Sequence, residues 1–198
     1  YYEDSDAGRA AWHADANGYI AGMRAKLPLL FITLPRADVV VKAVEPFREK
    51  SAGKAFYQRP SLDGTRSGVF YGNLYQMKEM PRYELEALVY HEAIPGHHMQ
   101  NAIAMENRSL PRFRGLGGFT AYGEGWGLYS ERLGKEMGFY ADPWSEFGRR
   151  PEENGDAGTD HGAAAPLFVI GDKVRGGVHG SHPSLTNLDN HGDLRPSV

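Results

Sequence analysis

The sequence predicts an α+β fold that is mainly helical, with a hairpin of two helices, a small sheet, and an irregular, loop-rich tail. Three observations carry this prediction. Apolar residues recur at helical spacing in three segments, and two short apolar runs rich in β-branched and aromatic residues separate the first segment from the others. All 11 tyrosines, six methionines and three tryptophans precede residue 151. The residues after that point are rich in glycine, aspartate and histidine. The tail is therefore predicted to form mostly turns.

The first helix and the sheet are predicted from the N-terminal part of the chain. Residues 7–26 read as a helix. The runs DVVVKAVEP (38–46) and SGVFYGNLY (67–75) read as strands, because each is short and bounded by turn residues. These segments are expected to support the two helices that come after them.

Two further helices are predicted to pack as a hairpin. Pro81 is expected to start the first of them, with Leu85, Leu88 and Val89 facing inward, and this helix runs into His91. After the turn GLGGF (115–119), the second helix carries an apolar stripe at three-to-four spacing: Tyr122, Trp126, Tyr129, Leu133 and Met137. This stripe is predicted to pack against the preceding helix.

Composition excludes several classes of protein. The 198 residues carry a net charge of −3 and no basic cluster, which argues against nucleic acid as the partner. No apolar run approaches the roughly 18 residues of a membrane-spanning helix. Without cysteine, any transition-metal site must use His, Asp or Glu. Because the chain starts at Tyr1 with no initiator methionine or signal peptide, it is expected to be a fragment or a processed piece.

The segment YHEAIPGHHMQ (90–100) predicts a metal site built on an interrupted helix. Zinc peptidases use His-Glu-x-x-His, whose histidines face the same way when they lie four residues apart on a helix. Here that second position is Pro95, and on an unbroken helix His97 would lie about 240° around from His91. Pro95 clashes with the carbonyl four residues back and cannot donate to it, so the helix must deform there. A bulge or restart would then bring His97 or His98 toward His91, and the spacing leaves both open.

The predicted helix after the glycine-rich turn offers a third ligand. Glu124 and Glu131 lie seven residues apart and therefore on one face. The segment GEGWGLYSE resembles the ligand-bearing helix of the gluzincin zinc peptidases. The resemblance implies that Glu124 completes the site with His91 and a later histidine, that Glu92 is the catalytic base, and that one Zn²⁺ is the cofactor.

The two segments HEAIPGHHMQ and EGWGLYSERLG together resemble the bacterial family called domain of unknown function 885, grouped with the gluzincin peptidases. The resemblance covers residues 7–149 and implies that His97 is the ligand and His98 a neighbour or supporting group. Members are exported or lipoprotein-like, which implies a periplasmic or secreted location. They are also several times longer than this chain.

The tail resembles the C-terminal part of another family, domain of unknown function 1501, related to alkaline phosphatases and sulfatases. SEFGRRPEENGDAGTDHG carries this resemblance, which implies Asp160 and His161 as metal ligands. The other ligands of such a site would lie upstream, where the chain resembles a peptidase instead. We therefore expect two fragments, residues 1–149 and 150–198, joined as a hybrid at SEFGRR. The second is expected to dock poorly, with one strand at 165–170.

Several residues have a structural alternative beside the functional one. Glu131 either supports a ligand histidine or pairs with Arg132 or Lys135. Tyr122 and Tyr129 are core residues of the stripe or, alternatively, oxyanion donors.

Asn73 either binds substrate backbone in an edge strand, as the strand before the zinc helix does in gluzincins, or stabilises a turn. The function predicted from these residues is zinc-dependent hydrolysis of peptide bonds in a peptide or peptide-like substrate. One alternative is a non-catalytic truncated hybrid that retains metal binding. A weaker one is a fragment of a phosphate or sulfate ester hydrolase.

Overall fold

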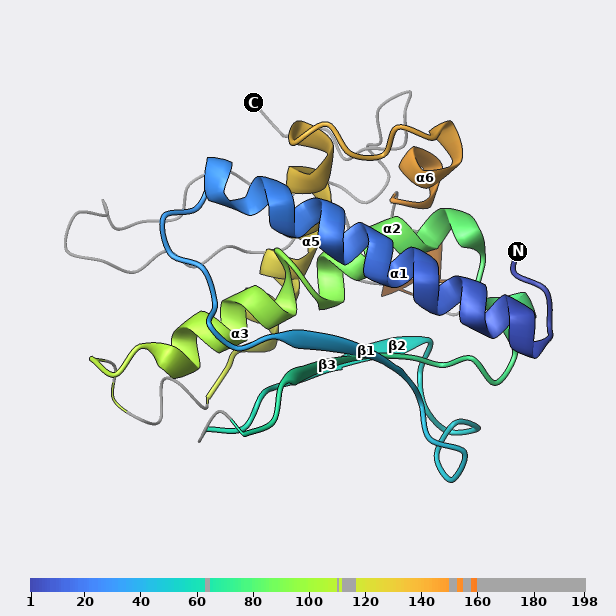
Figure 1. Ribbon diagram of the computed structural model, residues 1–198, viewed down its shortest axis with the longest axis horizontal. Coiled ribbons are helices and arrows are strands. Elements are labelled where there is room, and N and C mark those ends of the chain that lie inside the picture. The colour runs from blue at the N-terminus through green and yellow to red at the C-terminus, as the bar shows by residue number, and fades with distance from the viewer. Residues whose placement is uncertain (63–64, 110, 112–116, 150–152, 155–157, 160–198) are drawn as a thin grey trace.

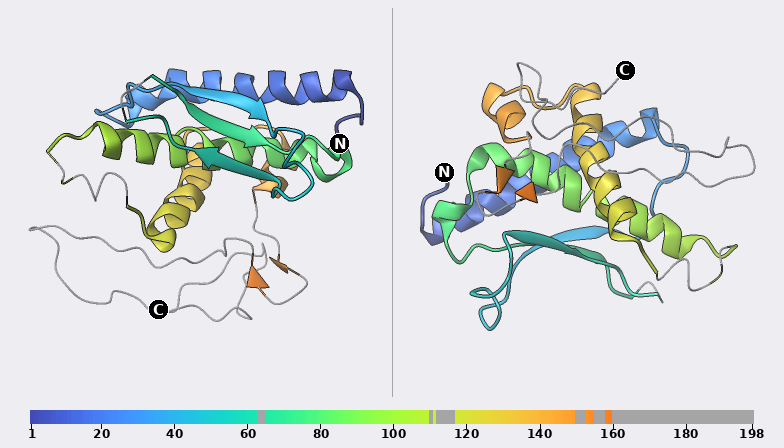
Figure 2. Two further views of the ribbon diagram at one scale, coloured as in Figure 1. Left: turned by 90° about the horizontal axis from the view of Figure 1, so that it is seen from below. Right: turned by 180° about the vertical axis from the view of Figure 1, so that it is seen from behind.

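The computed structural model describes residues 1–62, 65–109, 111, 117–149, 153–154 and 158–159. Within these residues the chain is mainly helical with a three-stranded sheet, which confirms the α+β prediction. Figure 1 shows α1 and α2 lying side by side above the sheet, while α5 crosses them at a steep angle. The right-hand view of Figure 2 shows the sheet as one layer and the helices as the other.

Helix α1 (Asp6–Lys26) begins where the Ser5 hydroxyl accepts a hydrogen bond from the Gly8 amide at 3.2 Å. Its inner face places Trp12, Ala16, Ile20 and Met23 in the core at intervals of three or four residues. It is followed by the short 3-10 helix η1 (Leu27–Leu29). The predicted helix over 7–26 is therefore confirmed to within one residue.

The sheet contains β1 (Val39–Ala43), β2 (Ala55–Gln58) and β3 (Gly68–Gly72) in the order β1-β3-β2. Strand β3 pairs parallel with β1 and antiparallel with β2, and all five of its residues are buried. Two expectations are thereby corrected. The sequence predicts no strand at β2. The strand expected at the edge of the sheet, β3, is the central one, so the backbone of β3 is already paired on both sides.

The remaining elements come after the sheet. Beyond the 3-10 helix η2 (Met77–Glu79), the described residues form four α-helices: α2 (Arg82–Glu92), α3 (His97–Glu106), α5 (Thr120–Glu136) and α6 (Pro143–Gly148). Helix α2 lies at the centre and contacts α1, α5 and α6. The predicted pairing of two helices is confirmed for α2 and α5, with α3 as an additional helix between them in the chain.

The predicted packing face of α5 is correct in part, since Leu133 is buried and Met137 packs against the core. Tyr122 and Tyr129 are 47% and 46% exposed, and the buried face of α5 consists of Gly127, Ser130, Leu133 and Gly134. Small residues let the two backbones approach closely: a Cβ atom at Gly134 would lie 2.7 Å from the ring of Tyr90 on α2. Helical spacing of large apolar residues identified the helix and part of its packed side, but not the glycines on that side.

Helix α6 closes the other side of α2. A Cβ atom at Gly148 would lie 2.0 Å from the carbonyl oxygen of Tyr83, so the two helices touch backbone to backbone. Glu146 accepts hydrogen bonds from Arg149 and Lys135, which together hold its pKa at about 2 despite partial burial. Helix α6 is therefore part of the packed structure.

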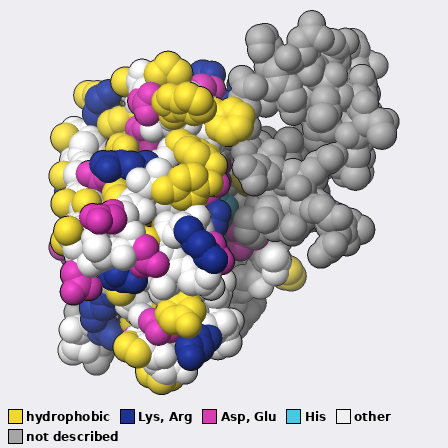
Figure 3. Space-filling view, turned by 90° about the vertical axis from the view of Figure 1, so that its right-hand side faces the viewer, with side chains coloured by type: hydrophobic (Ala, Val, Ile, Leu, Met, Phe, Trp, Pro, Cys, Tyr) yellow, Lys and Arg dark blue, Asp and Glu magenta, His cyan; other side chains and the backbone are white. Residues whose placement is uncertain are grey.

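The surface seen in Figure 3 mixes positive and negative side chains, with hydrophobic ones gathered in its upper part. Exposed aromatic residues near α6 include Tyr1, Trp144 and Phe147. Among the described helices, none combines the length and apolar character needed to cross a membrane.

The predicted second fragment falls largely outside the described residues. From its range the structure describes one short antiparallel pair, β4 (Glu153–Asn154) with β5 (Gly158–Thr159). Asp160, His161 and the predicted strand at 165–170 lie outside the described residues. Their predicted roles, and the predicted boundary between two fragments, remain predictions.

Candidate metal centre

Three side chains from three helices converge beside the sheet. His91 lies at the end of α2, His97 opens α3, and Glu124 lies in the first half of α5. One ligand atom from each lies within 4.8 Å of the others. The Nε2 atoms of His91 and His97 lie 3.1 Å and 3.5 Å from Oε2 of Glu124. The structure thus brings together the three residues that the sequence suggested as ligands.

The break between α2 and α3 delivers His97 to this cluster. Helix α2 ends at Glu92, Ala93 takes a non-helical conformation, and α3 starts four residues later. Gly96 is required there, because a Cβ atom on it would lie 1.8 Å from the carbonyl oxygen of His91. The Ile94–Pro95 peptide bond is cis. The interruption predicted from Pro95 and Gly96 is therefore present, and it places His97 and His91 with ring centroids 4.7 Å apart.

His91 is held between two carboxylates. Its Nδ1 lies 2.7 Å from Oε1 of Glu131, and its Nε2 contacts Glu124. Burial alone would lower the pKa of His91, but the hydrogen bonds with Glu124 and Glu131 outweigh it and raise the pKa to about 10. Glu131 therefore fixes the ring through Nδ1 and leaves Nε2 directed at Glu124. Of the two roles predicted for Glu131, the structure favours support of a histidine, since Arg132 and Lys135 pair with Glu136 and Glu146.

Glu92 follows His91 directly and is buried at the end of α2. Its negative charge contributes to the raised pKa of His91, which places its carboxylate in the field of the cluster. The residue expected to act as a base is therefore next to one candidate ligand in the chain and interacts with it electrostatically.

His98 points away from the cluster into the sheet side of the core. Its Nδ1 lies 3.0 Å from the Tyr57 hydroxyl, and its Nε2 lies 2.9 Å from the carbonyl oxygen of Ala37. The side chain is buried, which lowers its pKa, and a Cβ atom at Gly68 would lie 2.4 Å from its ring. His98 thus anchors α3 to β2 and β3, and of the two adjacent histidines the structure places only His97 in the cluster.

The remaining predicted residues lie outside the cluster. On a helix, Tyr122 is about 200° and Tyr129 about 140° around from Glu124. Tyr129 instead lines an apolar groove of about 510 Å³ beside Leu29 and Leu30. The Asn73 amide donates to the carbonyl oxygens of Glu49 and Ala52, at 2.8 Å and 3.0 Å. Asn73 therefore stabilises the chain segment before β2, in keeping with the turn alternative.

Gly127 was not singled out from the sequence, although it shapes the site directly. It lies three residues after Glu124 and four before Glu131, so it shares their face of α5. A Cβ atom there would lie 2.5 Å from Cε1 and 2.6 Å from Nε2 of His91. The available signal was a glycine inside a helix, between two carboxylates on one face.

The substitution Gly127→Ala is expected to displace the His91 ring and to weaken binding of the zinc ion predicted from the sequence by about tenfold or more, comparable to the loss of a supporting residue. The matched control is Gly123→Ala, one turn earlier on the same helix, where a Cβ atom meets no atom within 4 Å. Removing a helical glycine should there raise stability by up to about 1 kcal/mol. Competitive zinc titration and thermal unfolding measure both effects. Equal zinc affinity in the two variants would contradict the close approach at Gly127.

Comparisons with known proteins match two parts of this chain to two families. Residues 1–154 match the family described as bacterial protein of unknown function (DUF885), and residues 144–192 match the family described as protein of unknown function (DUF1501). Both resemblances expected from the sequence are thereby confirmed, and the matched ranges overlap at 144–154. Among curated proteins, no match was found.

One similar solved structure is that of a protein of Colwellia psychrerythraea described as a "putative lipoprotein". It shares 42% identity with this chain and superposes with a TM-score of 0.73 over 75% of this chain. The match covers 26% of the Colwellia protein, so this chain spans well under half of that relative's length. Because the family match extends over most of the chain, the protein belongs to the bacterial DUF885 family.

Proposed function

We propose that this protein binds one Zn²⁺ through His91, His97 and Glu124 and hydrolyses peptide bonds. The observation that carries the proposal is the convergence of the three ligand atoms within 4.8 Å of one another. A tetrahedral zinc ion with bonds of about 2.05 Å separates its ligand atoms by about 3.3 Å. The separations of 3.1 Å and 3.5 Å from Glu124 to the two histidines bracket that value.

The chemistry of the donor set supports zinc and a catalytic role. Two imidazoles and one carboxylate form the three-ligand set of catalytic zinc sites, which leaves a fourth position for water or substrate. Glu131 adds the carboxylate contact to Nδ1 that orients ligand histidines in such sites. The resemblance of both helices to gluzincin peptidases supports the same reading. A cation at this position would replace a proton on His91 Nε2, the nitrogen that contacts Glu124, and would leave the contact of Nδ1 with Glu131 in place.

The residues take separate roles in this proposal. When bound, zinc would lower the pKa of a water molecule and polarise the substrate carbonyl. Glu92 accepts the proton of the attacking water as its oxygen bonds to the carbonyl carbon. Glu92 then delivers that proton to the amine as the carbon–nitrogen bond breaks. Glu131 and Gly127 keep the His91 ring in place, the first by a hydrogen bond and the second by leaving room for it.

The sheet supports a peptide-like substrate. In the described sheet β2 is an edge strand, and an extended peptide can add to such an edge through backbone hydrogen bonds. Strand β2 contacts α2 and α3, the helices that carry His91 and His97. The substrate-binding role expected of the strand at 67–75 therefore passes, in this proposal, to β2.

We also propose a location outside the cytoplasm. The support is the similarity to the Colwellia protein described as a lipoprotein, since a lipoprotein is an exported protein.

A non-catalytic metal-binding chain is the second candidate, favoured by one observation. The match covers only 26% of the Colwellia protein, so groups that complete a catalytic site in the rest of such a protein have no counterpart in the matched range. In that case the cluster binds zinc without hydrolysing peptides.

Metal analysis and a hydrolysis assay separate these candidates. The chain, purified without added metal, is expected to contain about one equivalent of zinc and to cleave an internally quenched peptide library. Activity should be lost on dialysis against a chelator and restored by zinc. Bound zinc without cleavage would favour the non-catalytic candidate. A chain that neither retains nor takes up zinc would refute the metal site itself.

A further inference from the structure

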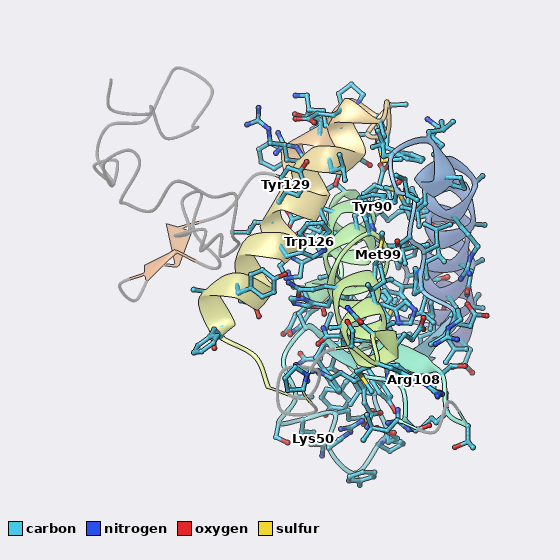
Figure 4. All side chains as sticks on the ribbon, turned by 90° about the vertical axis from the view of Figure 1, so that its left-hand side faces the viewer. Lys50, Tyr90, Met99, Arg108, Trp126 and Tyr129 are labelled. Carbon is cyan, nitrogen blue, oxygen red and sulfur yellow. The ribbon has the colours of Figure 1, made fainter. Side chains whose placement is uncertain are left out.

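A tryptophan on α5 holds the break that precedes His97. The indole Nε1 of Trp126 donates a hydrogen bond to the carbonyl oxygen of Pro95 at 2.8 Å. Pro95 is fully buried in the break between α2 and α3, so its carbonyl group needs a partner within the protein. Figure 4 shows Trp126 on α5, where that helix passes the α2–α3 segment.

The positions of this bond in the chain connect two of the candidate ligands. Pro95 lies two residues before His97, and Trp126 lies two residues after Glu124 on the same helix. The break itself has no continuous helical hydrogen bonding, because α2 ends at Glu92 and α3 starts at His97. A contact from α5 to the middle of the break therefore ties the position of His97 to the helix that carries Glu124.

The side chain of Trp126 is itself confined. Its ring meets Phe31 edge-on with centroids 6.5 Å apart and packs beside Tyr129 with centroids 5.6 Å apart. These two aromatic neighbours limit the rotamers open to the indole. The N–H group is thereby aimed at Pro95 by packing that does not involve the cluster.

We propose that Trp126 is a positioning residue, whose indole N–H fixes Pro95 against α5 and so sets the separation between His97 and Glu124. The consequence for zinc rests on the proposed function, whereas the consequence for the break is a property of the chain alone. Sequence reasoning assigned Trp126 only to an apolar stripe. The hydrogen bond gives a reason for tryptophan at this position where phenylalanine would fill similar space.

The experiment replaces the N–H group while keeping the ring. Trp126→Phe removes the donor, and incorporation of β-(3-benzothienyl)alanine at position 126 replaces N–H by sulfur in a ring of nearly the same shape. The matched control is Trp144→Phe, which changes an exposed tryptophan on α6. Zinc affinity is expected to fall about tenfold in both Trp126 variants, and the visible absorption of the Co²⁺ complex is expected to shift. Trp144→Phe should match the parent chain in both measurements.

A second measurement needs no metal. The His98 amide donates to the carbonyl oxygen of Ala93 at 3.1 Å across the break, so its hydrogen exchange reports on opening of this segment. In the metal-free chain, hydrogen exchange at the His98 amide should be about tenfold faster in both Trp126 variants than in the parent. In Trp144→Phe it should match the parent. Parent-like exchange in the benzothienyl variant would overturn the proposal. If the parent binds no zinc but exchange accelerates as expected, the proposed function fails while the positioning role stands.

Discussion

Replacing His97 with alanine is expected to remove most of the bound zinc, whereas replacing His98 with alanine is expected to leave it. His97 Nε2 lies 3.5 Å from Glu124, while both ring nitrogens of His98 are engaged with Tyr57 and Ala37. Loss of one of three protein ligands should exceed the roughly 10–100-fold cost of losing a supporting residue. Zinc content after gel filtration, followed by competitive titration, measures the difference.

The two variants need a control for folding, because His98 is buried. His98→Ala should lower thermal stability, since it leaves the Ala37 carbonyl group and the Tyr57 hydroxyl without their partner. His13→Ala provides a histidine replacement on α1, outside the cluster. Circular dichroism establishes which variants remain folded. A folded His98→Ala protein that has lost zinc, beside a His97→Ala protein that retains it, would show the ligand assignment to be wrong.

The substitution Glu92→Gln is expected to reduce peptide hydrolysis by about 10²–10⁴-fold, the contribution typical of a general base, with zinc content unchanged. Glutamine keeps the size of the side chain but cannot accept the proton from water. Because Glu92 is not among the three converging ligand residues, its replacement should not weaken metal binding. Steady-state kinetics and metal analysis on one preparation test both halves of the expectation.

A surface variant controls for the change from carboxylate to amide. Glu136→Gln alters an exposed residue that pairs with Arg132 at 3.3 Å, so hydrolysis should be unaffected. Full activity in Glu92→Gln would refute the assignment of the base. Loss of zinc in Glu92→Gln would instead indicate that Glu92 helps to hold the metal.

The sequence was informative where one local rule dominates. Helical periodicity located α1, α2 and α5, and the conflict between Pro95 and a continuous helix predicted the break before His97. The choice between His97 and His98 did not follow from spacing, because a break can turn either histidine inward. It followed from family resemblance, and the structure shows His98 engaged in contacts with β2 and Ala37.

The errors arose where tertiary packing overrides local pattern. Strand β2 has four residues and no clear alternation, so its strand character depends on pairing with β3. The buried face of α5 is predicted only in part, because large apolar residues are the usual signal of a core face. Here the packed face contains Gly127 and Gly134, whose missing side chains make room for His91 and Tyr90. Because glycine has no side chain, such a packed face gives no hydrophobic periodicity in the sequence.

The docking of α6 bears on how such a protein tolerates exchange of its parts. The two family matches meet within 144–154, and α6 opens that interval as a helix pressed against α2 at Gly148 and Tyr83. Helix α6 is thus complete before the interval ends. A crossover just past Arg149 would exchange the downstream residues and keep His91, His97 and Glu124 on α2, α3 and α5. Shuffling of genes at this joint would therefore leave the three candidate ligand residues together.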